Sequence, residues 1–251
     1  MAETIQERGL DLEVADPRWR DLYIIGGFSG ILMSVLTVIA IVIFFIWPYK
    51  PGLTSTVDMF TTIQHDALAG LMSLDFFMVV ITIISIPFFL ALYVALKNVN
   101  ESSALIAVVF GMISCTLILT ARPIAELFYL SGQYAAATTD AARSQTLAAG
   151  EALSALFNGT AWVLYFITAS VDLLISSLLM LRTKAFSKTT AYMGIFMNIG
   201  VLSVFAVVPG FTLYAAMLNL VTTFVGTIWN VLVARSLLQL GRRQPSTVAA
   251  R

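Results

Sequence analysis

The chain has 251 residues, of which 59% are hydrophobic and 11% are charged, and its formal net charge is zero. A soluble domain carries about 25% charged residues, and a mean hydropathy of +0.91 is too high for a water-soluble fold of this length. Composition therefore excludes a soluble globular protein, and the lack of a basic patch argues against nucleic acid as a partner. We expect the lipid bilayer to be the main partner.

The N-terminal segment, residues 1–21, is polar and acidic (MAETIQERGLDLEVADPRWRD). It lacks the charged and then apolar pattern of a cleaved signal peptide. We therefore divide the chain into a cytoplasmic N-terminal segment (1–21), a transmembrane domain (22–240) and a cytoplasmic tail (241–251).

Six apolar runs follow this segment, and each is long enough to cross a bilayer as a helix of about 20 residues. They cover approximately 22–47, 67–97, 104–131, 152–182, 190–208 and 211–236. They predict an all-α fold, a polytopic transmembrane bundle of six membrane-spanning helices. Several runs are longer than a bilayer needs, so those helices must tilt or extend beyond the hydrocarbon.

The connectors differ in character. Residues 48–66 begin with two prolines and a glycine and predict an irregular loop. Residues 132–150 are rich in alanine, so they either extend the third and fourth helices past the membrane or form a short helix on its surface. Pro209 and Gly210 alone separate the last two runs, which predicts a tight antiparallel pair.

Basic residues alternate between the two sides of this arrangement. Eleven lie in the segments that would share one side, against Lys50 and Arg143 on the other. The eleven are Arg8, Arg18, Arg20, Lys97, Arg182, Lys184, Lys188, Arg235, Arg242, Arg243 and Arg251. The positive-inside rule then predicts that both termini are cytoplasmic. We expect a multi-pass protein of a prokaryotic inner membrane.

The third run contains an arginine and a glutamate in the sequence TARPIAELF, residues 120–128. Arg122 and Glu126 are four residues apart, which places them on one face of a continuous helix. Pairing them would lower a cost of about 2.5–3.5 kcal/mol for each charge near the bilayer centre. Pro123 removes a backbone donor and loosens the preceding turn. The pair is either a structural ion pair or part of a working site.

Two aspartates add to this set. Asp75 lies close enough to the outer end of the second run to reach Arg122, whereas Asp172 is too deep in the fourth run to share it. Three carboxylates against one arginine favour either a protonated acid or a bound cation. The alternative is that Asp172 stays neutral and forms a hydrogen bond with Asn198 or with a serine of a neighbouring helix.

Asparagines within apolar runs join helices through hydrogen bonds, and we expect this role for Asn158 and Asn198. We place both in an intramembrane polar cluster with Asp75, Arg122, Glu126 and Asp172. Gly26 and Gly30 form a GxxxG pattern that favours close helix packing, either within the chain or in a homo-oligomer.

No sequence motif indicates catalysis. HExxH and clustered His or Cys residues do not occur, so we predict no metal site. GxSxG, Walker and GxGxxG motifs do not occur either, so we predict no cofactor and no catalytic residues. Two hypotheses follow: a small transport or permeation protein for a proton or cation, or a non-catalytic sensor or accessory component whose intramembrane charges are structural. A third, an intramembrane enzyme, is disfavoured because the sequence offers no nucleophile–base pair.

Four segments resemble a bacterial and archaeal family of six-span membrane proteins classed as a domain of unknown function. These segments are SLDFF, ALYVALKNVNESSALIAVVFG, LMLRTKAFSKTTAYMGI and IWNVLVARSLLQLGRR. The resemblance implies a fold of six helices. It implies no activity and no catalytic residues.

Overall fold

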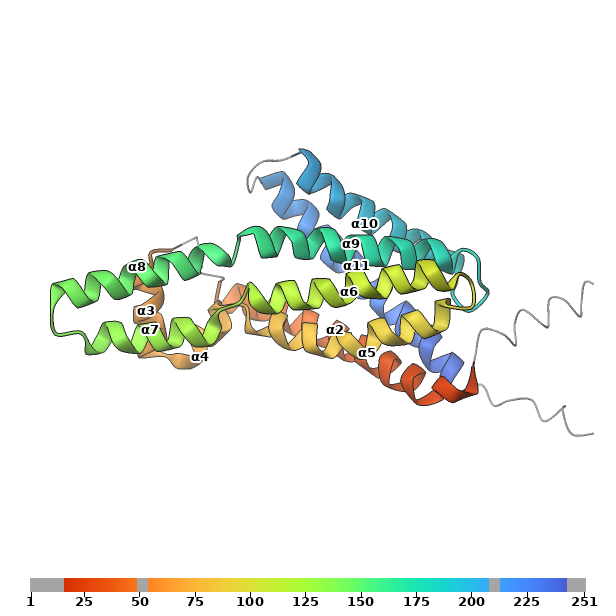
Figure 1. Cartoon of the computed structure of the whole chain (residues 1–251), viewed down its shortest axis with the longest axis horizontal. Coiled ribbons are helices and arrows are strands. Elements are labelled where there is room, and N and C mark those ends of the chain that lie inside the picture. Colours follow the sequence, from red (N-terminus) through yellow and green to blue (C-terminus); the bar gives the residue numbers. More distant parts are fainter. Residues whose placement is uncertain (1–15, 49–53, 208–212, 243–251) are drawn as a thin grey trace, which may run out of the picture. The chain divides into compact units, whose positions relative to one another are not determined.

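The computed structural model describes residues 16–48, 54–207 and 213–242, and every regular element in these ranges is a helix (Figure 1). The expected all-α class is therefore confirmed. The helices are η1 (Pro17–Trp19), α2 (Arg20–Ile46), α3 (Thr56–His65), α4 (Ala67–Ser73), α5 (Phe76–Leu96), α6 (Glu101–Thr120), α7 (Ile124–Ala136), α8 (Asp140–Leu156), α9 (Thr160–Met180), α10 (Lys188–Val207) and α11 (Leu213–Arg242).

Within the described residues, five helical stretches are long and apolar enough to cross a membrane. They are Pro17–Ile46, Phe76–Leu96, Glu101–Ala136, Asp140–Met180 and Val221–Arg242. Large apolar side chains of these helices and of α10 are exposed, as is expected of a surface that faces lipid. Phe28 is 57% exposed, Phe196 74% and Phe224 63%. The structure is compatible with a multi-pass membrane protein.

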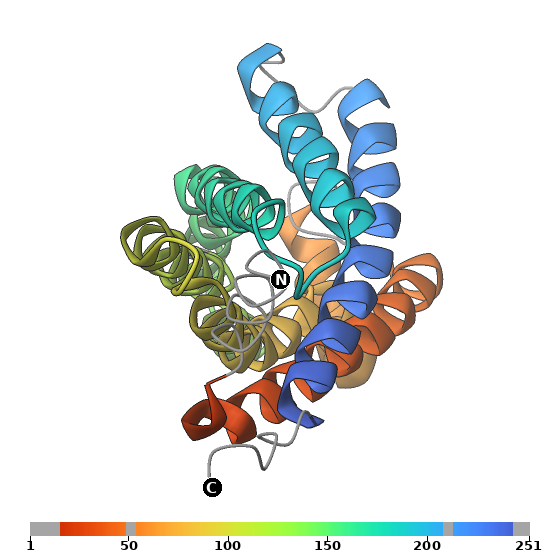
Figure 2. The same ribbon diagram turned by 90° about the vertical axis from the view of Figure 1, so that its right-hand side faces the viewer.

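The chain divides into two compact units. Among the described residues, unit 1 comprises 16–35, 84–113, 166–207 and 213–242, and unit 2 comprises 36–48, 54–83 and 114–165. Unit 1 contains α10 and α11, which pack side by side (Figures 1 and 2). Pro209 and Gly210, on which the prediction of a tight pair rests, lie outside the described residues.

In unit 1, glycines of α2 allow neighbouring helices to approach closely. A Cβ atom at Gly26 would collide with Ala91 Cβ and lie 3.0 Å from the carbonyl oxygen of Pro87, both in α5. A Cβ atom at Gly30 would lie 2.8 Å from Phe88 Cε2 in α5 and 2.9 Å from Ala234 Cβ in α11. The GxxxG pattern thus serves helix packing within the chain.

We expect Gly26→Ala to destabilise the protein by about 1–3 kcal/mol, because the added methyl group overpacks the contact between α2 and α5. Gly132 of α7 provides the control, since a Cβ atom there would meet nothing within 4 Å. Gly132→Ala should instead stabilise by about 1 kcal/mol through helix propensity. Unfolding free energies in mixed micelles measure both changes. Equal effects of the two substitutions would contradict the packing.

The start of α2 lies beside the end of α11 in unit 1. Arg20 Nε donates a hydrogen bond to the carbonyl oxygen of Gly241 at 3.2 Å. The ammonium group of Lys97, in the connector between α5 and α6, lies 5.0 Å from the ring centroid of Trp19. Basic and aromatic side chains therefore gather at one end of this unit.

Unit 2 contains α3, where an irregular loop was predicted, so that prediction is wrong over Thr56–His65. Ser55 caps the helix, since its Oγ accepts a hydrogen bond from the backbone N–H of Asp58 at 3.1 Å. Asp66 caps α4 in the same way through the N–H groups of Leu68 and Ala69. Two good N-caps within 11 residues outweigh the prolines that precede them.

The helices α3, α4, α7 and α8 form a small bundle with its own core, which we call the cap. Its core contains Met59, Phe60, Ile63, Leu74, Leu127 and Phe157, all of which are buried. Two hydrogen bonds connect α3 to α7 within this bundle. Gln64 Nε2 donates to Ser131 Oγ at 2.8 Å, and Ser131 Oγ donates to the carbonyl oxygen of Phe60 at 3.1 Å.

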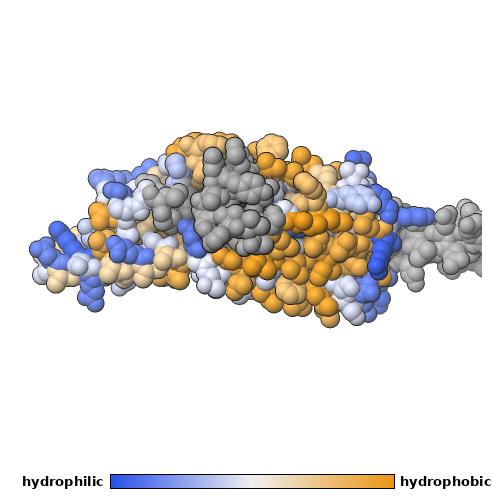
Figure 3. All heavy atoms as spheres, turned by 90° about the horizontal axis from the view of Figure 1, so that it is seen from above, coloured by the Kyte–Doolittle hydropathy of each residue, from blue (hydrophilic) through white to orange (hydrophobic). Residues whose placement is uncertain are grey.

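The cap extends the third and fourth apolar runs, as one of the two alternatives for residues 132–150 predicted. α7 continues to Ala136 and α8 begins at Asp140. Hydrophilic side chains cover the end of unit 2 at the left of Figure 3. Asp140 and Arg143, at the start of α8, are both exposed. By contrast, α5, α6 and α9 have 20 or 21 residues each, which is the length that crosses the hydrocarbon core.

Candidate functional site

Three helix interruptions meet at one arginine in unit 2. α4 ends at Ser73 before α5 begins at Phe76, α6 ends at Thr120 before α7, and α8 ends at Leu156 before α9 (Figure 1). Arg122 lies in the second interruption, directly before Pro123. Because proline cannot donate a backbone hydrogen bond, it favours the end of a helix at this position.

The guanidinium group of Arg122 contacts all three interruptions. Its Nε and Nη2 atoms each lie 2.9 Å from Oδ2 of Asp75. Its Nη1 donates to the carbonyl oxygens of Ala121 at 3.1 Å and Phe157 at 3.0 Å. The group also lies over two rings, with Cζ 5.1 Å from the centroid of Phe157 and 4.2 Å from that of Trp162. Each of the three side-chain nitrogens thus has an acceptor.

Helix ends explain why a cation is stable at this position. The last carbonyl groups of a helix have no partner within it, and they carry the negative end of the helix dipole. Arg122 donates to carbonyl groups at the ends of α6 and α8, so its charge faces two negative helix ends, and the carboxylate of Asp75 lies on the third side. The side chain is 1% exposed, and its hydrogen bonds to Ala121 and Phe157 replace the bonds that water would otherwise supply.

Asp75 holds its carboxylate toward Arg122 through an uncommon backbone conformation. Its φ of 62° lies in the left-handed region, which aspartate and asparagine adopt more readily than other non-glycine residues. Its own carbonyl oxygen accepts the N–H of Met78 at 3.0 Å in the first turn of α5. The residue therefore joins α4 to α5 and supplies the counter-ion of Arg122.

The structure places two other predicted members of the polar cluster, Glu126 and Asn158, outside continuous helices that contain Arg122. The predicted pairing of Arg122 with Glu126 is wrong, because α6 stops before Arg122 and the two residues do not share a continuous helix. Glu126 is exposed in the first turn of α7, where an acidic side chain favours the positive end of the helix. Asn158 is also exposed, in the turn between α8 and α9 rather than inside a helix.

Sequence reasoning missed Phe157 and Trp162 as partners of Arg122. The sequence contains one indication of the role of Phe157, because Asn158 and Gly159 mark a turn that divides the fourth apolar run. A turn at this position leaves the carbonyl group of Phe157 without a hydrogen-bond donor from its own helix. Aromatic faces attract guanidinium groups, but the sequence spacing between residues 122 and 162 does not indicate that they meet.

We expect Trp162→Leu to destabilise the protein by about 1–2 kcal/mol, because it removes the nearer of the two rings that face Arg122. Trp162→Phe should recover part of this loss, since phenylalanine keeps an aromatic face with a weaker attraction for cations. Denaturant titration of the two variants measures the difference. Equal unfolding free energies for the leucine and phenylalanine variants would contradict a cation–π contribution.

Unit 1 contains the remaining acid of the predicted cluster. Asp172 of α9 is 2% exposed, and its Oδ1 accepts a hydrogen bond from Ser176 Oγ at 3.2 Å. Its Oδ2 is buried against Gly111 of α6 and has no hydrogen-bond partner among the described residues. A carboxylate in this position would be a buried charge with no counter-ion among the described residues, which is an energetically costly arrangement.

Asn198 does not form the predicted hydrogen bond with Asp172. Its Nδ2 donates instead to the carbonyl oxygen of Gly194, one turn earlier in α10, at 2.7 Å. Ser177 Oγ and Trp229 Nε1 also lie against Gly194, and both are buried without a partner in the described part of the chain. Close approach at Gly194 therefore joins α9, α10 and α11.

No protein-family model, curated protein or solved structure matches the chain. The resemblance to the six-span family therefore stays a prediction. The described residues also contain no group of three or more His, Cys, Asp or Glu side chains that could hold a metal ion.

Proposed function

We propose that the protein crosses a prokaryotic inner membrane six times, with both termini in the cytoplasm. The sixth span in this proposal is α10, whose 20 residues are sufficient for a bilayer. The contact between Arg20 and Gly241 supports it, because an even number of spans brings the two ends of the chain to the same side. The excess of basic residues favours the cytoplasm for that side.

Cysteine labelling tests this topology. In a Cys115→Ala background, Gln145→Cys places a thiol on the exposed face of α8, and Lys184→Cys places one in the connector between α9 and α10. A membrane-impermeant maleimide should label the first in intact spheroplasts and the second only after permeabilisation. The reverse pattern would overturn the orientation, and labelling of both from one side would overturn the number of spans.

The function that the geometry supports best is that of a non-catalytic membrane component, a sensor or an accessory subunit, which holds the cap outside the membrane. The observation that carries this proposal is that all three guanidinium nitrogens of Arg122 contact acceptors of the protein, with four contacts for the five N–H donors. An arginine that binds or moves an ion needs a free donor or an exchangeable partner. In this protein the guanidinium group instead connects the three helix interruptions through its contacts with Asp75, Ala121 and Phe157.

A proton-linked transport or permeation protein is the second candidate, and Asp172 favours it. A buried acid with a free oxygen in an apolar span is a site where a proton could bind and leave. The surrounding ligands favour a proton over a metal cation, since Asp172 has a serine hydroxyl group as its polar neighbour.

Thermal unfolding of the purified protein separates the two candidates. Wild type and Asp172→Asn are compared across pH and across a panel of monovalent and divalent cations. A structural role predicts that both proteins respond alike. A step in unfolding temperature tied to pH or to one cation, and absent from Asp172→Asn, would overturn the non-catalytic proposal in favour of proton- or cation-linked transport. Proteoliposomes loaded with a pH-sensitive dye should then show flux with wild type.

A further inference from the structure

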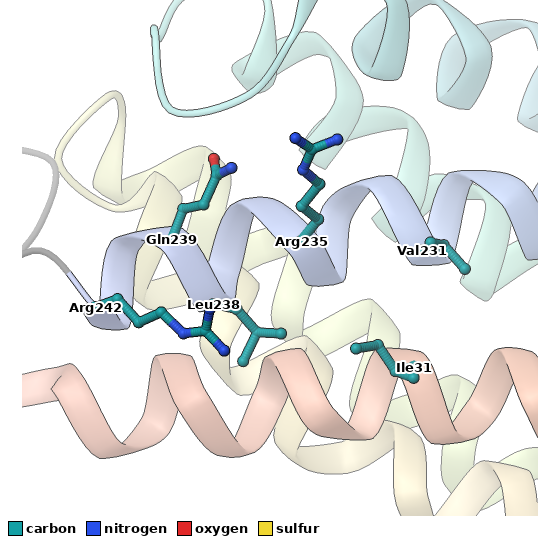
Figure 4. Close-up of a pocket in the computed structure, with 6 residues that line it drawn as sticks. All are labelled: Ile31, Val231, Arg235, Leu238, Gln239 and Arg242. Carbon is teal, nitrogen blue, oxygen red and sulfur yellow. The ribbon is translucent and has the colours of Figure 1, made fainter.

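A pocket between α2 and α11 combines apolar side chains with two arginines that form no ion pair with another described residue. Its volume is about 240 Å³, and it lies entirely within unit 1 (Figure 4). The lining residues are Ile31 of α2 and Val231, Arg235, Leu238, Gln239 and Arg242 of α11. Leu238 and Arg242 extend toward α2 in Figure 4, whereas Arg235 and Gln239 project from the opposite edge of α11.

The chemistry of the pocket changes along α11. The lining residues of α11 recur three or four positions apart, so they share one broad side of the helix, with Leu238 and Arg242 at its edge toward α2 and Arg235 and Gln239 at its other edge. Val231, which is 44% exposed, lies nearest the middle of the chain's last apolar run. Arg235, Gln239 and Arg242 follow toward the helix end, and the two arginines are about 10 Å apart along the axis at 1.5 Å per residue. Apolar contacts therefore precede hydrogen-bond donors in the direction from the bilayer to water.

Both arginines are available to a ligand. Arg235, Gln239 and Arg242 are exposed. The ion pairs among the described residues are Arg18 with Asp16 and Arg122 with Asp75, so no described carboxylate neutralises either arginine. Guanidinium groups form strong, charge-assisted hydrogen bonds with phosphate oxygens, and the amide of Gln239 adds further donors.

We propose that this pocket binds the phosphate group of an anionic phospholipid, with an acyl chain along Ile31 and Val231. A phospholipid fits better than a soluble phosphate because exposed apolar side chains continue from the donors, with Ile31 38% exposed. Basic pockets between membrane helices near the cytoplasmic surface are typical sites for anionic headgroups.

The test compares phospholipid binding to the full-length protein by native mass spectrometry and by tryptophan quenching with brominated lipids. Mixed micelles contain phosphatidylglycerol, phosphatidylcholine, or phosphatidylcholine with inorganic phosphate. Wild type should bind phosphatidylglycerol about 30-fold more tightly than phosphatidylcholine, since each arginine near the surface contributes about a factor of five to ten. Arg235→Gln with Arg242→Gln should abolish this preference.

The matched control is Arg182→Gln with Lys184→Gln, which removes two exposed positive charges from the connector between α9 and α10. It should leave the preference within about twofold, because screening limits long-range attraction. An equal loss in the control would overturn the pocket in favour of general charge attraction. Equal binding of phosphatidylglycerol and phosphatidylcholine by folded wild type, or full competition by millimolar inorganic phosphate, would overturn a lipid ligand. Arg235→Lys with Arg242→Lys keeps the charges and should retain most of the preference.

Discussion

Arg122→Ala should destabilise the protein by about 3 kcal/mol or more, the largest loss that we expect from a single charged residue. Removal of one partner from a buried ion pair typically costs about 3–5 kcal/mol, because the remaining charge loses its counter-ion. The side chain of Asp75 is 31% exposed, so water can solvate its carboxylate after Arg122 is removed. We therefore expect the cost of breaking the ion pair to lie near the lower end of this range. The carbonyl groups of Ala121 and Phe157 also lose their donor.

Arg143→Ala is the matched control for this substitution. Arg143 lies on the exposed face of α8, and its Nε donates to the carbonyl oxygen of Ala137 at 3.2 Å. Exposed substitutions of this kind change stability by about 0.5 kcal/mol or less. The measurement is the unfolding free energy of both variants in mixed micelles. Similar small losses for Arg122→Ala and Arg143→Ala would contradict the structural role of Arg122.

Phe60→Ala should destabilise the cap by about 3–5 kcal/mol, because it opens a cavity in a small core. Phe60 is fully buried, and its ring lies 5.7 Å from that of Tyr134. A Cβ atom at Gly150 of α8 would lie 2.5 Å from its Cζ atom, so the ring also fills the contact between α3 and α8. Protease digestion should cut the cap of this variant well before the membrane helices.

Tyr129 of α7 provides the aromatic control, since it is 67% exposed. Tyr129→Ala should leave both the protease resistance and the unfolding free energy close to those of wild type. If Phe60→Ala were as resistant to protease as Tyr129→Ala, the cap would not have the packed core described above.

Much of the helical architecture could be predicted from the sequence because long apolar runs are a strong signal for helices. The run at 22–47 corresponds to α2 (Arg20–Ile46), and the run at 190–208 corresponds to α10 (Lys188–Val207). The cap could be predicted only in part. The sequence contains the N-cap residues Ser55 and Asp66, but the prolines before them favoured the prediction of a loop. The packing of α3 into a core depends on helices that are distant in sequence.

The site was harder to predict than the fold because its contacts are tertiary. Spacing suggested that Arg122 pairs with Glu126, but this inference assumes a helix that continues through Pro123. The prediction that Asp75 can reach Arg122 came from the similar distance of the two residues from the outer end of their apolar runs, and it agrees with the ion pair in the structure. The carbonyl group of Phe157 and the ring of Trp162 became visible as partners only where the three helix interruptions meet.

A double-mutant cycle between Arg122 and Asp75 tests most directly the claim that this pair is structural. The variants are Arg122→Met, Asp75→Asn and the combination, since asparagine tolerates the left-handed backbone at position 75. We predict that each single substitution destabilises the protein and that the double variant loses less than the sum, with a coupling energy of about 1.5–3 kcal/mol. Additive losses, or single variants as stable as wild type, would contradict the claim.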